Sequence, residues 1–126
     1  MKVRLFRHIF VALLFLAGQA RGNGVWDGIY VGKMDNVAER SSGRACGGGR
    51  IKRIRVHNNV FIFPYNESEG VSIPAKIDAN GVVTGETNSA RAGARIEARI
   101  ATGIMSGTVY GQWCTYTIKL SRQSTN

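Results

Sequence analysis

The sequence has few of the residues from which metal centres and hydrolytic sites are built. It contains two cysteines and two histidines in 126 residues, and only one histidine, His57, lies beyond the N-terminal apolar segment. Two thiols and one imidazole fall short of the four ligands of a structural zinc. The acidic residues are scattered, and no base stands near a nucleophile in any recognisable arrangement. We therefore expect no metal, no cofactor and no enzymatic activity.

The chain also lacks any convincing helical periodicity, and its one long apolar run lies near the start. Three basic residues precede the uncharged run 9–17, and residues 18–20 put small side chains three and one before a cut. This pattern predicts a signal peptide over 1–20 and export to the periplasm or the exterior. The apolar run is too short to span a bilayer as a permanent anchor. A single domain over 21–126 would follow, with no later segment apolar enough to span a membrane.

Acidic residues are the scarcer charge. The chain has 17 lysines and arginines against eight acids, a formal net charge of +9. Removing 1–20 removes three basic residues and no acid, which leaves about +6. Such a charge favours anionic partners without selecting one.

The two cysteines, Cys46 and Cys114, are expected to pair, because an even cysteine count in an exported chain is typical of disulfides. Closing a loop of roughly 70 residues contributes about 4 kcal/mol in the chain-entropy model.

Alternation of apolar and polar residues, broken by turn signals, predicts seven or eight short strands and an all-β fold. The strands would form an antiparallel up-and-down meander, curled into a small barrel or a flattened sandwich. The glycine-rich stretch 35–49 reads as a long loop. The clearest strands are expected at 24–34, 50–57, 60–65, 71–77 and 113–120, with hairpins around 78–81 and 102–103.

Three turns set the expected register. Asn58-Asn59 tolerates the positive φ of a tight hairpin, and Asp78 to Gly81 suits a type I turn with a glycine bulge. A two-residue loop at 102–103 places one apolar and one polar face on the flanking strands. The expected pairs are Ile77 with Val83, Ala75 with Gly85, Ile100 with Met105, Ala98 with Gly107, and Ile96 with Val109.

The most distinctive feature is a basic stretch between residues 40 and 55. Arg53 and Arg55 share a face of one strand, and the hairpin brings Val60 and Ile62 beside them. Such a surface could bind an anionic envelope polymer, a glycolipid or an acidic protein, whereas nucleic acid is not favoured because stacking aromatics are not interleaved. The alternative is a solvated edge strand whose charges deter association. The candidate binding residues are Arg44, Arg50, Lys52, Arg53, Arg55 and Ile62.

A non-enzymatic exported binding protein is the leading interpretation, and two others stay open. Trp26, Tyr30, Trp113 and Tyr116 lie at the first and last strands, and some could line a barrel that carries an apolar ligand. The loop 66–70 could instead be the probe of an inhibitor of an extracellular enzyme.

The segments WDGIYVG, DANGVVTG and IATGIMSGTVYGQWCTYTIKL resemble a loose group of small exported bacterial β-meander proteins. Members have a WDGxYxG-type opening, repeated glycine-bounded hairpins and a late strand with a cysteine. The shared motifs are turn and strand chemistry, so the resemblance implies a fold and an address and assigns no functional residue.

Overall fold

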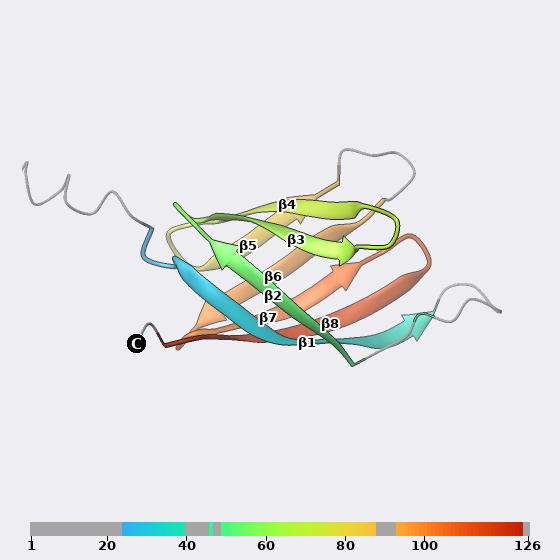
Figure 1. The fold of residues 1–126 in the computed structure, drawn as a ribbon. Coiled ribbons are helices and arrows are strands. Elements are labelled where there is room, and N and C mark those ends of the chain that lie inside the picture. Colours follow the sequence, from blue (N-terminus) through green and yellow to red (C-terminus); the bar gives the residue numbers. More distant parts are fainter. Residues whose placement is uncertain (1–23, 40–45, 47–48, 88–92, 125–126) are drawn as a thin grey trace, which may run out of the picture.

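Eight strands follow one another along the chain and form one antiparallel sheet (Figure 1). The computed structural model describes residues 24–39, 46, 49–87 and 93–124, so the predicted signal peptide and Arg44 lie outside the described residues. No helix of the described part is long and apolar enough to cross a membrane. The strands are β1 (Gly28–Glu39), β2 (Arg50–Val56), β3 (Val60–Asn66), β4 (Val71–Ile77), β5 (Val82–Glu86), β6 (Arg95–Ala101), β7 (Ile104–Tyr110) and β8 (Cys114–Arg122).

The sheet coils until its two ends almost meet. Its order is β2-β1-β8-β7-β6-β5-β4-β3, so the edge strands β2 and β3 are neighbours in the chain. They are joined at one bridge between His57 and Val60 and then diverge, as Figure 1 shows. We call the gap between β2 and β3 the seam. The predicted all-β meander is confirmed, as a nearly closed barrel of eight strands.

The barrel interior is filled by the inward-facing side chains of every strand. Two-residue alternation places them, since inward residues are buried and their neighbours face solvent on β2, β4 and β8. The largest fully buried side chains are Tyr30, Phe63, Met34, Ile73, Ile96, Met105, Leu120, Val83 and Val109.

Glycines at inward positions let neighbouring strands approach closely. A Cβ atom at Gly32 would lie 1.9 Å from the Lys119 carbonyl oxygen, and one at Gly107 would lie 2.3 Å from the Glu97 carbonyl oxygen. Only hydrogen fits at such positions, so these glycines permit the strong coiling that closes the barrel.

The predicted turns and registers are confirmed. Asn58 and Asn59 have φ of 52° and 62°, and Thr102 has φ of 54° in the 102–103 loop. The Gly81 N–H donates to the Asp78 carbonyl at 3.0 Å, which closes the predicted type I turn. Ile77 pairs with Val83 and Ile100 pairs with Met105, and the other three predicted pairs form as well.

The first strand differs from the sequence prediction at both ends. Residues 24–27 form a turn rather than a strand, because Asp27 folds back on Gly24. The strand then continues into the predicted loop, and β1 pairs with β8 as far as Glu39 opposite Cys114, past a bulge between Asn36 and Ala38. Polar residues can extend a strand here because β8 supplies the backbone partners. Trp113 precedes β8 and is 40% exposed.

A disulfide joins Cys46 to Cys114, as predicted, across a sequence separation of 68 residues. Both cysteines are buried. The Tyr116 hydroxyl donates to the Cys46 carbonyl at 3.0 Å, so residue 46 is fixed to β8 by two adjacent interactions. The Tyr65 ring packs edge-on against Tyr116, with 6.0 Å between centroids. The disulfide thus fastens one end of the barrel.

Replacing Cys46 and Cys114 together by serine should lower the free energy of unfolding by about 4 kcal/mol, because the unfolded chain regains the entropy of the open loop. Urea denaturation of the oxidised protein and of this variant measures the difference. Reductant should shift the wild-type midpoint and leave the variant unchanged. An unshifted wild-type midpoint would mean that the bond adds nothing to the barrel.

Candidate anion-binding face

The outer side of β2 carries two of the predicted arginines. Arg53 and Arg55 are exposed, while Ile54 and Val56 between and beside them are buried. Strand alternation therefore sends both guanidinium groups to the outer surface, as the sequence predicted.

Two further cations lie on the neighbouring strands. Lys33 of β1 pairs directly with Lys119 of β8, and both side chains are exposed. Like charges placed opposite each other destabilise a sheet, so this pair repels unless an anion lies over it. We define the basic face as Lys33, Arg53, Arg55 and Lys119. The carboxylate of Asp35, two residues after Lys33 on the same side of β1, accepts the Gly49 N–H at 2.8 Å and forms no ion pair with any of the described residues.

Aliphatic side chains alternate with these cations across the strands. Register places Ile51 beside Lys33, Val31 beside Arg53, and Ile29 beside Arg55. Beyond the seam, Val60 pairs with Lys76 and Ile62 pairs with Pro74. Ile51, Val60 and Ile62 are 63%, 52% and 59% exposed, three of the six large apolar residues that stand out into solvent in the described part. We call Ile51, Val60 and Ile62 the exposed aliphatics.

A groove of about 880 Å³ adjoins the basic face on the outer surface of β3 to β6. Arg55, Val60 and Ile62 form one wall, with Pro74 and Lys76 next to them. Glu86, Arg95 and Glu97 form the far wall, where Arg95 is engaged by an ion pair with Glu97 and by the Tyr110 ring at 4.0 Å. The end of the groove at β2 and β3 is therefore cationic and aliphatic, and the far end is acidic.

Lys52 does not belong to this surface, although the sequence interpretation included it. It has the same parity as Ile54 and Val56, and its relative exposure is 4%. Its ammonium group lies across the seam and donates to the Pro64 carbonyl at 2.6 Å and more weakly to the Tyr65 carbonyl at 3.4 Å. The long side chain thus links β2 to β3 where backbone pairing between them has ended.

Burial and neighbouring groups shift the pKa of two residues of the seam, Lys52 and Tyr65. Burial lowers the pKa of the Lys52 ammonium, and Arg50 lowers it further, while Glu67 at 3.9 Å acts in the opposite direction. Burial and the neighbouring Tyr116 raise the pKa of Tyr65 to about 12. Arg50 is exposed and has the same parity as Lys52, at the start of β2 where the seam is open, so it does not share a side of the strand with Arg53 and Arg55.

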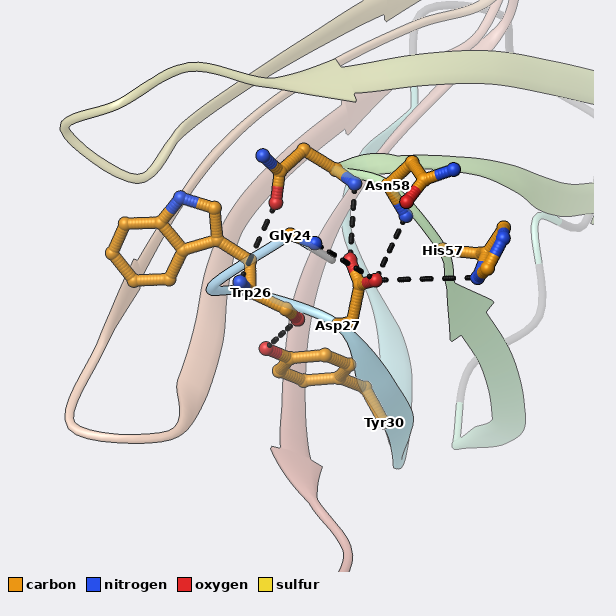
Figure 2. A network of polar contacts seen from close by, with 7 residues as sticks. Gly24, Trp26, Asp27, Tyr30, His57 and Asn58 are labelled. Carbon is orange, nitrogen blue, oxygen red and sulfur yellow. Dashed lines mark hydrogen bonds and ion pairs between the residues drawn. The ribbon is translucent and has the colours of Figure 1, made fainter. Parts of the chain in front are cut away.

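The closed end of the seam is held by Asp27, as Figure 2 shows. Its carboxylate accepts backbone N–H groups from Gly24 at 3.1 Å, Asn58 at 2.9 Å and Asn59 at 3.0 Å. His57 lies 4.0 Å away and is three-quarters exposed. Burial raises the pKa of Asp27, but the three N–H donors and His57 outweigh it and hold the pKa below the ordinary 3.8. With its oxygens occupied by backbone donors, Asp27 serves as a cap of the turn.

The rest of the WDGIY motif anchors the same end of the barrel. The Trp26 indole N–H donates to the Asp78 carbonyl at 3.0 Å, and the Tyr30 hydroxyl donates to the Trp26 carbonyl at 2.7 Å. Arg122 of β8 then donates to the Tyr30 hydroxyl at 2.7 Å. These bonds join the chain before β1 to β1 and to the turn between β4 and β5, and they join β1 to β8, so the motif is structural.

Sequence reasoning missed Lys33, Lys119 and Lys76, which lie far from the basic stretch in the chain. Strand alternation places each on the outer side, but only the order of β8, β1 and β2 brings Lys119 and Lys33 next to Ile51. In the described part of the chain, no three histidine, cysteine or acidic residues are grouped so that they could hold a metal ion.

Comparison of the chain with family models, with curated proteins and with solved structures finds no match. The likeness to exported β-meander proteins with a WDGxYxG-type opening therefore stays a prediction from sequence.

Charge reversal at two adjacent residues of β2 should change the free energy of unfolding by very different amounts. Lys52→Glu places a carboxylate against two carbonyl oxygens inside the seam, and we expect a loss of about 3 kcal/mol or more in the free energy of unfolding. Arg53→Glu on the outer side should change it by about 0.5 kcal/mol at most. Urea denaturation of both variants tests this, and equal losses would contradict the inward position of Lys52.

Asp27→Ala should lower the free energy of unfolding by about 2 kcal/mol, because three backbone N–H groups lose a charged acceptor. Since the folded-state pKa of Asp27 lies below its unfolded value of 3.8, its contribution is present well above the unfolded pKa and is lost as the pH falls through the folded pKa. Urea midpoints at pH 7 and pH 3 measure both effects. The difference between the two proteins should shrink at pH 3; a constant difference would rule out the carboxylate charge as its source.

Proposed function

We propose that the protein is an exported, non-enzymatic binding protein that holds an anionic component of the cell envelope on its basic face. The observation that carries the proposal is the cross-strand pair of Lys33 and Lys119 beside Arg53 and Arg55. The ion pairs in the described part of the chain involve Lys52, His57 and Arg95, so these four cations have no acidic side chain as partner. An anion that covers them would remove their mutual repulsion.

The packing of the barrel favours this surface over an internal ligand site. Tyr30, Phe63 and Leu120 have no exposed area, and further aromatic and aliphatic side chains fill the space around them. Tyr30 and Tyr116 are core residues, and Trp26 is packed against the core. An apolar ligand carried inside would have to displace these side chains, which costs packing energy. The outer face needs no such rearrangement.

Export rests on the predicted signal peptide together with the disulfide. A disulfide between Cys46 and Cys114 fits an oxidising compartment such as the periplasm or the exterior. Anionic polymers and glycolipids of the envelope are then the partners within reach.

Reversing two charges of the basic face should abolish binding to anionic envelope components. The oxidised protein lacking residues 1–20 would be titrated with soluble anionic polysaccharides and with anionic lipid vesicles between 20 and 300 mM salt, roughly spanning strong and weak screening. We expect an affinity that falls steeply with salt in the wild type. Arg53→Glu combined with Arg55→Glu should reduce it at least tenfold, since each cation near an anionic surface is worth about 1 kcal/mol.

Arg99→Glu is the matched control. Arg99 is exposed on β6, four strands from β2 in the sheet order, and faces Ser106 and Val82. It changes the net charge in the same direction but lies outside the basic face. Binding that weakens equally per charge in this variant would reduce the effect to net charge, and no binding at low salt would refute the proposal.

A further inference from the structure

The basic face differs from a simple cationic patch because three of its four cations, Lys33, Arg53 and Arg55, have an aliphatic residue as cross-strand neighbour. Across β1 and β2 the pairs are Lys33 with Ile51, Arg53 with Val31, and Arg55 with Ile29. On β3 and β4, Val60 stands beside Lys76. An anionic polysaccharide would pair with the charges and leave the exposed aliphatics in water, without gain from the hydrophobic effect.

We propose that the partner is an anionic lipid surface, into which the exposed aliphatics insert while the cations meet the head groups. The inference rests on the proposed function and names the chemistry of its partner. Aliphatic side chains gain most in a hydrocarbon environment, and lysine and arginine stems lie along apolar surface while their charges reach phosphate oxygens.

The composition of the face favours a lipid over a protein partner. Protein interfaces are depleted of lysine and obtain much of their energy from aromatic side chains. The contact described here contains Lys33, Lys76 and Lys119, and its exposed apolar members are isoleucine and valine. Alternating aliphatic and cationic residues are typical of surfaces that lie on anionic bilayers.

The groove limits how the barrel would sit. Its wall at Arg55, Val60 and Ile62 continues the cationic and aliphatic surface, whereas Glu86 and Glu97 on the far wall would be repelled by anionic head groups. The barrel would therefore rest on β1, β2 and the start of β3, with Lys119 of β8 and Lys76 of β4 at the two margins of the contact and with β5 and β6 turned away from the bilayer. The seam would lie over the membrane, closed by Lys52 against Pro64.

Vesicle binding tests the lipid chemistry directly. The oxidised protein would be sedimented with vesicles of phosphatidylcholine alone and with vesicles that also contain phosphatidylglycerol. We expect binding that requires phosphatidylglycerol and falls as salt rises. Ile51→Ser combined with Ile62→Ser should weaken it about tenfold or more, because two aliphatic side chains no longer leave water.

Val37→Ser is the matched control for this pair. Val37 is 57% exposed but lies on β1 beyond the last residue pair with β2, so its replacement should leave vesicle binding unchanged. Binding of both variants to a soluble polyanion, dextran sulfate, should equal that of the wild type, because their charges are intact.

The outcomes separate the two proposals. Binding to dextran sulfate with no binding to phosphatidylglycerol vesicles would overturn the lipid inference and leave the anion-binding function standing. Vesicle binding that is as strong in the Ile51→Ser and Ile62→Ser variant as in the wild type would also overturn it, because charge alone would then suffice. Absence of binding to both probes at low salt would overturn the inference and the proposed function together.

Discussion

The closure of the sheet at the seam is the constraint on which the rest of the barrel depends. Two edge strands of a coiled sheet expose unpaired backbone groups, and a barrel removes them only where the edges meet. Here β2 and β3 meet at the His57–Val60 bridge and then separate. Asp27 holds the turn at the closed end, and Lys52 spans the gap at the open end. Both links are polar. Beyond the His57–Val60 bridge, β2 and β3 are therefore held together by charged side chains rather than by a ladder of backbone hydrogen bonds.

The same two strands carry part of the surface to which we assign function, namely Arg53 and Arg55 on β2 and the exposed aliphatics on both strands. An inward lysine and an edge proline protect a strand from pairing with another chain. Lys52 on β2 and Pro64 on β3 both have this character, and Pro64 has no N–H to offer. These two features oppose pairing of β2 and β3 with the strand of another chain, so the outer sides of the two strands stay exposed. Their arginines and aliphatic residues can serve contact with a flat partner.

The sequence predicted the fold well because its signals are local. Positive-φ asparagines, the Asp78 to Gly81 turn and two-residue alternation act within a few residues, and together they specify the register of neighbouring strands. Alternation from Arg53 and Arg55 places Lys52 on the inner side of β2, although lysine side chains are rarely buried. The ends of β1 were not predictable in this way. Its extension to Glu39 depends on β8, and the turn at 24–27 depends on Asp27 reaching the Asn58-Asn59 turn.

The candidate site was harder to predict from the sequence than the fold, because its residues come from three strands. Lys119 and Lys33 lie 86 positions apart and become neighbours only through the β1–β8 pairing. That pairing is long-range, since it brings the first and last strands together, and no local signal encodes it. Once it forms, the two lysines lie opposite each other, and their repulsion lowers the stability of the folded state. This pair, beside two arginines that form no ion pair within the described residues, is the observation on which the proposed binding of an anion rests.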